Sequence, residues 1–113
     1  MKFTVILLFC IFLFSCTKDK VTEAVTDSNC TDSVSFATEI LPLIQNNCTV
    51  CHNLGNSTGY VFTNYMNIAS NAPAIVGSMN GSGYQLMPQG GPALADSLVQ
   101  RFQCWVSQGK KNN

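Results

Sequence analysis

Residues 48–52 read Cys-Thr-Val-Cys-His, and His52 is the only histidine in the chain. One chemistry requires two cysteines at this spacing with a histidine directly after the second. The two thiols add to the vinyl groups of one haem, and the histidine ligates its iron. The segment therefore predicts one covalently bound haem c, held by Cys48 and Cys51, with His52 as an axial ligand of the iron. A chain that holds a porphyrin must also fold around it.

Three other interpretations of this segment are weighed against the haem interpretation. A thioredoxin-like redox pair belongs in a βαβ unit, and the sequence has no such pattern. A structural zinc site needs four ligands, and no second Cys/His pair of this spacing follows. A chance match without any cofactor is the third alternative. The haem interpretation is favoured because the single histidine stands at the one position that the chemistry requires.

Length and charge limit the class of protein. The chain has 113 residues and a formal net charge of zero. The length predicts one small domain. Binding to nucleic acid is not expected, because it needs a basic patch that neutralises phosphates.

The N-terminus predicts export. Lys2 precedes an apolar run over residues 3–14, which is too short to span a bilayer and typical of a secretory signal. A buried or interfacial helix is the alternative. The run ends in "LFSC", which resembles the lipobox of bacterial lipoproteins through Leu13, Ser15 and Cys16. The resemblance implies a signal peptide over residues 1–15, cleavage before Cys16 and lipid attachment to Cys16. Thr17 stands where an aspartate often marks inner-membrane retention, so the outer membrane is favoured.

The mature chain divides into a tether and a domain. Residues 16–34 are rich in Thr, Ser, Asp and Lys and lack apolar periodicity, so we expect a flexible, solvated tether. Residues 35–113 form the expected folded domain. Its first helix begins after Ser35, with a kink or a break into two pieces at Pro42. A short helix is expected near residues 63–72, mostly irregular chain over 73–94, and a C-terminal helix after Ala95 with an apolar face. That face comprises Leu98, Val99, Phe102, Trp105 and Val106.

A second iron ligand has to be something other than histidine, since the chain has only one. The mature part offers Met66, Met79 and Met87. Met66 falls in an expected helix, which favours a role in core packing. Met87 is followed by Pro88 and a pair of glycines that permit close approach of the backbone. Met87, Met79 or an open iron site remain as alternatives on these grounds.

Four motifs together resemble one family. They read "ILPLI", "CTVCH", "MPQGG" and "WVSQGKKNN", and they occur in this order over residues 35–113. This part of the chain is similar to class I c-type cytochrome domains, and especially to short monohaem lipoprotein cytochromes. The resemblance implies an all-α fold, a small cytochrome c-like helical domain around one covalently bound haem. It also places Met87 at the family's position for the second axial ligand.

The six cysteines have separate expected fates. Cys10 leaves with the signal, Cys16 takes lipid, and Cys48 with Cys51 takes haem. Cys30 and Cys104 remain, an even number in an oxidising compartment. Similar cytochromes pair a cysteine before the first helix with one on the last helix, so the resemblance implies a Cys30–Cys104 disulfide. Two free thiols are the alternative.

The expected function is electron transfer without catalysis. The resemblance implies a monohaem c-type cytochrome, lipid-anchored on the periplasmic side of the cell envelope, whose partners are exported redox proteins. The expected domain carries few charges, so docking should be apolar and brief, with little long-range steering. One alternative is a haem protein whose open iron site binds a small gas or peroxide. Another is a haem-free structural lipoprotein.

Overall fold

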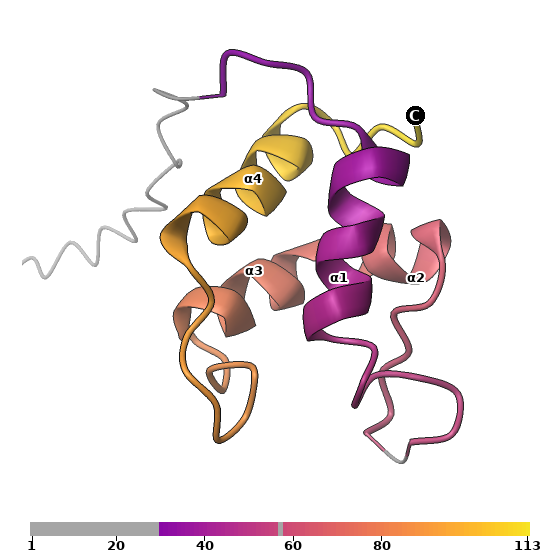
Figure 1. Cartoon of the computed structure of the whole chain (residues 1–113), viewed down its shortest axis with the longest axis vertical. Helices are drawn as coiled ribbons and strands as arrows, with labels where there is room; N and C mark the ends of the chain where they lie inside the picture. The colour runs from indigo at the N-terminus through magenta and orange to yellow at the C-terminus, as the bar shows by residue number, and fades with distance from the viewer. Residues whose placement is uncertain (1–29, 57) are drawn as a thin grey trace, which may run out of the picture.

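The computed structural model of the chain describes residues 30–56 and 58–113. The expected signal peptide, Cys16 and residues 17–29 of the expected tether lie outside this part. The described residues form one π-helical turn and four α-helices, with no strand among them (Figure 1). These elements are η1 (Phe36–Ile40), α1 (Leu41–Asn47), α2 (Tyr65–Ser70), α3 (Ala72–Asn80) and α4 (Asp96–Ser107). The predicted all-α class is confirmed for this part of the chain. None of the described helices is long and apolar enough to cross a membrane.

η1 and α1 form one helical segment that changes type next to Pro42. Ser35 caps its start, because the Ser35 hydroxyl accepts the backbone N–H of Thr38 at 3.3 Å. In η1 the N–H groups of Ile40 and Leu41 bond to carbonyls five residues back. Pro42 then lies in the first turn of α1, where a residue without an N–H is tolerated. η1 and α1 are therefore two short helical elements that follow each other without a gap, which matches the expected division at Pro42 but without a break in the helix.

Asn113 closes the start of this helical segment from the other end of the chain. The Asn113 side-chain oxygen accepts the N–H of Phe36 at 3.0 Å. The Asn113 backbone oxygen accepts the N–H of Ala37 at 2.8 Å and the hydroxyl of Ser35 at 2.9 Å. The first N–H groups of a helix have no partner within the helix. Asn113 thus supplies acceptors that the helix itself cannot, and the C-terminus lies beside the start of η1 (Figure 1).

α3 occupies a stretch for which mostly irregular chain was expected. Pro73 lies in the first turn of α3, a position at which proline is compatible with a helix. Ile75 and Met79, four residues apart, are both buried, so one face of α3 packs into the core. α3 ends at Gly81, which adopts a φ of +69° as its C-cap. The expectation of irregular chain was wrong over residues 73–80, because it rested on the density of Gly, Pro, Ser and Asn in the segment, and Pro73 and Gly77 are both compatible with α3.

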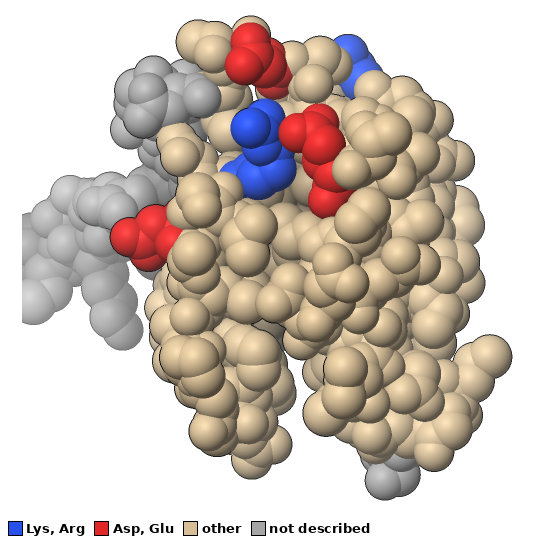
Figure 2. All heavy atoms as spheres, in the orientation of Figure 1, with Lys and Arg blue, Asp and Glu red and all other residues tan. Residues whose placement is uncertain are grey.

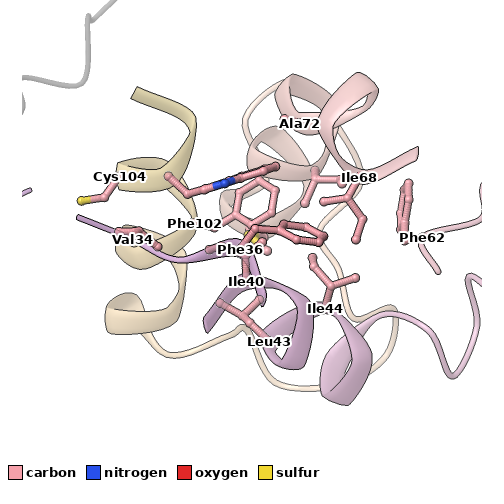
Figure 3. Close-up of a cluster of buried hydrophobic side chains, with 13 residues drawn as sticks. Val34, Phe36, Ile40, Leu43, Ile44, Phe62, Ile68, Ala72, Phe102 and Cys104 are labelled. Carbon is pink, nitrogen blue, oxygen red and sulfur yellow. The ribbon is translucent and has the colours of Figure 1, made fainter. Parts of the chain in front are cut away.

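α4 packs across η1 and α3 and contributes the largest buried side chains. Phe102 and Trp105 are fully buried, and their rings lie 5.3 Å apart between centroids. The indole N–H of Trp105 donates to the carbonyl of Lys111 at 2.8 Å, so its polar group is satisfied. Side chains from all the helical elements meet in this core (Figure 3). The core comprises Val34, Phe36, Ile40, Leu43, Ile44, Phe62, Ile68, Ala72, Ile75, Met79, Phe102, Cys104 and Trp105.

Residues 30–34, assigned to the tether from the sequence, pack against α4. Cys30 forms a disulfide with Cys104, and their Cα atoms lie 5.3 Å apart. Val34 is 1% exposed, and its N–H donates to the Gln108 side-chain oxygen at 2.9 Å. The disulfide links positions 74 residues apart. Closing a loop of this size stabilises the fold by about 4.5 kcal/mol in the chain-entropy model. The folded part thus extends at least from Cys30.

Candidate functional site

Cys48, Cys51 and His52 follow directly on the end of α1. The N–H of Cys48 donates to Ile44, and the N–H groups of Cys51 and His52 both donate to the Cys48 carbonyl, at 3.2 and 2.8 Å. This tight turn places two cysteines and the histidine in one compact segment at the C-terminal end of α1. Cys48 and Cys51 are free thiols. Both remain chemically available for attachment to a cofactor.

The two thiols differ in their surroundings. Cys48 is partly buried against the core, whereas Cys51 is exposed. Burial raises the pKa of the Cys48 thiol from 9.0 to about 11, because an apolar environment disfavours the thiolate. Thiol–disulfide exchange proceeds through the thiolate. At neutral pH the Cys48 sulfur is therefore protonated and is a weak nucleophile.

His52 is held at its backbone and at one ring nitrogen. Its carbonyl accepts the N–H of Phe62 at 2.9 Å, and the two rings pack with centroids 4.8 Å apart. Its Nδ1 lies 3.2 Å from the Tyr60 carbonyl oxygen. A carbonyl can only accept, so the neutral imidazole that makes this hydrogen bond carries its proton on Nδ1. Nε2 then keeps its lone pair, and this is the form in which histidine binds a metal.

His52 and Met87 line the same pocket. The volume of this pocket is about 170 Å³, and the pocket opens to the surface. Figure 2 shows the molecule hollowed at one end, between the lobe of the loop after α3 and the lobe that follows α1. The lining is mostly apolar and aromatic. It comprises His52, Tyr60, Phe62, Ala74, Ile75, Ser78, Tyr84, Gln85 and Met87.

The end of α3 positions Met87. Its backbone N–H donates to the Ser78 carbonyl at 2.9 Å, which ties the loop back onto the helix. The Tyr84 ring lies over Gly77, where an added Cβ would come within 2.3 Å of the ring. Gly77 therefore allows the loop to approach α3 closely. Sequence reasoning did not identify this role, although a glycine inside a helical stretch is a signal of close approach.

The other two described methionines lie elsewhere. Met66, expected in the core, is 67% exposed on α2, so that expectation was wrong. Met79, the alternative candidate in the sequence for the expected second iron ligand, is 3% exposed and belongs to the core cluster. Among the methionines in the described part of the chain, Met87 is the one that lines the pocket.

The donor set fits haem c. One imidazole with a free lone pair and one thioether face a common pocket, and two free thiols lie in the same segment as the imidazole. The surroundings are uncharged, because no Asp, Glu, Lys or Arg occurs in residues 40–95. An apolar pocket with few polar groups is typical of a cofactor site. Among residues 30–56 and 58–113, no three His, Cys, Asp or Glu side chains group together as ligands for a free metal ion.

Comparisons of this chain with protein-family models, with curated proteins and with solved structures find no match. The chemistry of the site therefore rests on its own residues and on the sequence motifs.

Proposed function

We propose that this chain is a monohaem c-type cytochrome, a lipid-anchored electron-transfer protein of the cell envelope. The observation that carries the proposal is the shared pocket: His52 and Met87, thirty-five positions apart in the sequence, line one cavity beside Cys48 and Cys51. When bound, haem c supplies an iron that cycles between the ferric and ferrous states by one electron.

Each residue of the site has a distinct part in this proposal. Cys48 and Cys51 would attach the porphyrin through thioethers, so the cofactor would not dissociate. Nε2 of His52 and the sulfur of Met87 would hold the iron. A thioether ligand such as the Met87 sulfur would favour the ferrous state and raise the reduction potential. Phe62, Ile75 and the other apolar lining residues would pack against the porphyrin and reduce its contact with water, which would limit reorganisation when the charge changes.

The distribution of charge supports an apolar mode of docking. In Figure 2 the charged side chains of the visible face gather away from the cleft. The charged groups of residues 35–113 are Glu39, Asp96, Arg101, Lys110 and Lys111, and Arg101 forms an ion pair with Glu39 at 3.4 Å. The rim of the cleft instead exposes Tyr60 and Tyr84. We propose that exported redox proteins dock there through uncharged surface, with association rates that depend little on salt.

A reduced-minus-oxidised spectrum of the purified, exported full-length protein tests the function. We expect the sharp α and β bands of a low-spin c-type haem in the reduced form. The change should reverse fully over repeated cycles of dithionite and ferricyanide. Protein without visible absorption would overturn the cytochrome proposal and leave the haem-free structural lipoprotein.

The lipid anchor is tested separately, at a residue outside the described part. Cys16→Ser removes the sulfur that would carry lipid, so the protein is expected to move from the detergent phase to the aqueous phase or to retain its signal. Cys10→Ser, in the expected signal peptide, is the matched control and should still partition with detergent. A Cys16→Ser protein that has lost its signal and still sediments with membranes would contradict the lipobox interpretation.

A further inference from the structure

The Thr58 hydroxyl makes three contacts that together use its whole hydrogen-bonding capacity. Its oxygen lies 3.0 Å from the Tyr60 carbonyl oxygen, 3.4 Å from the Tyr60 nitrogen and 3.2 Å from His52 Nδ1. A hydroxyl has one proton to donate and two lone pairs to accept with. The carbonyl can only accept, so the single proton points to the Tyr60 oxygen. The two lone pairs then face the Tyr60 N–H and Nδ1 of His52.

This assignment gives Nδ1 of His52 a second acceptor. The Tyr60 carbonyl and the Thr58 oxygen both lie 3.2 Å from Nδ1, and neither has a proton left to donate to it. With the Thr58 proton on the Tyr60 carbonyl, both contacts favour the proton on Nδ1. In the opposite tautomer, protonated on Nε2, the Nδ1 lone pair would face the Tyr60 carbonyl oxygen, and the Thr58 hydroxyl could donate to Nδ1 only by giving up its own hydrogen bond to that carbonyl. Thr58 thus adds to the preference for the tautomer that the Tyr60 carbonyl alone would select.

We propose that Thr58 is a positioning residue for the iron ligand: its hydroxyl, with the Tyr60 carbonyl, fixes the imidazole of His52 and makes Nε2 a stronger electron donor. The inference rests on the proposed haem function. Outer partners of a ligating histidine orient the ring and raise its basicity. A more basic ligand stabilises ferric iron more than ferrous iron, so Thr58 lowers the reduction potential in opposition to the Met87 sulfur.

Thr58 and Tyr60 are both exposed, and this decides which substitution is informative. In Thr58→Ala a solvent water can occupy the space of the hydroxyl and accept from Nδ1 in its place. In Thr58→Val a methyl group fills that space and blocks the water. The valine variant should therefore show the full effect, and the alanine variant a smaller one. Thr58→Ser keeps the hydroxyl and should behave like the unmodified protein.

The experiment measures the midpoint potential of purified holoprotein for the unmodified chain and for Thr58→Val, Thr58→Ala and Thr58→Ser. Loss of an outer partner costs about 10–100-fold in metal affinity. In Thr58→Val we expect the affinity of the site to fall three- to tenfold more for ferric iron than for ferrous iron. This difference corresponds to a rise in the midpoint potential of about 28–59 mV for a one-electron couple. In the reduced, diamagnetic protein, the Nδ1 proton of His52 should also exchange with solvent faster in Thr58→Val, as measured by NMR.

Thr63→Val is the matched control, since Thr63 is exposed in the same connection between α1 and α2. It should leave both the potential and the proton exchange unchanged. Equal potentials in Thr58→Val, Thr63→Val and the unmodified protein would overturn the inference, as would a potential that falls in Thr58→Val. Either result still leaves a haem-loaded protein, so the proposed function stands. Absence of haem from the unmodified protein would instead overturn the proposed function and this inference with it.

Discussion

Replacement of both Cys48 and Cys51 by alanine is expected to abolish covalent haem attachment completely. Thioethers survive denaturation, so the unmodified protein should keep its haem through acid–acetone extraction and show haem stain at its own mass on a denaturing gel. The double variant has no sulfur in this segment and should release all of its haem under both treatments. His52 and Met87 remain in the variant, so the measurement is made on denatured protein, where ligation alone cannot retain the group.

The chain offers a matched control for this experiment. Cys30 and Cys104 form the one disulfide of the described residues and lie away from the pocket lining. Their double replacement by serine should lower the stability of the protein, by up to about 4.5 kcal/mol, while leaving the haem covalently bound. Haem that extracts freely from the unmodified protein, or that stays with the Cys48→Ala, Cys51→Ala variant, would disprove attachment through these cysteines.

Local signals in the sequence were sufficient for the helices that begin and end the domain. Ser35 caps the first, Pro42 marks its change of type, and the apolar face of α4 includes the fully buried Phe102 and Trp105. These features depend on residues within one or two turns of each other, so a pattern reveals them. The N-cap of α4 is Ala95, with Asp96 in the first turn and no side-chain cap.

Features that depend on distant contacts could not be predicted in the same way. α3 was missed because proline and glycine suggested irregular chain, whereas Pro73 lies at its start and Gly77 lies under the Tyr84 ring. The exposure of Met66 and the burial of Met79 depend on how helices pack, which no local pattern gives. The cap from Asn113 and the contacts of Thr58 with His52 depend on the path of chain segments that carry no periodicity.

The candidate site depends both on a local sequence pattern and on contacts between distant segments of the chain. The Cys-Thr-Val-Cys-His segment predicts haem attachment from spacing alone, since that chemistry depends only on neighbouring residues. Met87 was selected from three methionines by its neighbours and by the family resemblance. In the structure it shares a pocket with His52 because α3 and the loop after it bring distant segments together. The identity of the second iron ligand is therefore the part of the site that most needs a direct experiment.

Met87→Ala is expected to convert a closed iron site into an open one. If the Met87 sulfur binds the iron in the unmodified protein, as proposed, no position on the iron is open, and the ferrous protein should bind carbon monoxide slowly or not at all. The oxidised protein should show the weak red charge-transfer band of ferric iron ligated by methionine. The variant should lose this band and bind carbon monoxide rapidly. Its potential should fall by on the order of 100 mV, within the range of about 0.8 V over which axial ligands set haem potentials.

Substitutions of the other two described methionines distinguish loss of the iron ligand from a general loss of stability. Met66→Leu changes a side chain that is 67% exposed, and Met79→Leu is a volume-conserving change within the core. Both variants should keep the red band, the slow reaction with carbon monoxide and the potential. If Met79→Leu alone loses these properties, the loop after α3 follows a different path in the haem-loaded protein and Met87 is not the ligand. If the unmodified protein already binds carbon monoxide rapidly, the iron has an open position, and gas binding becomes a better account of the site than electron transfer.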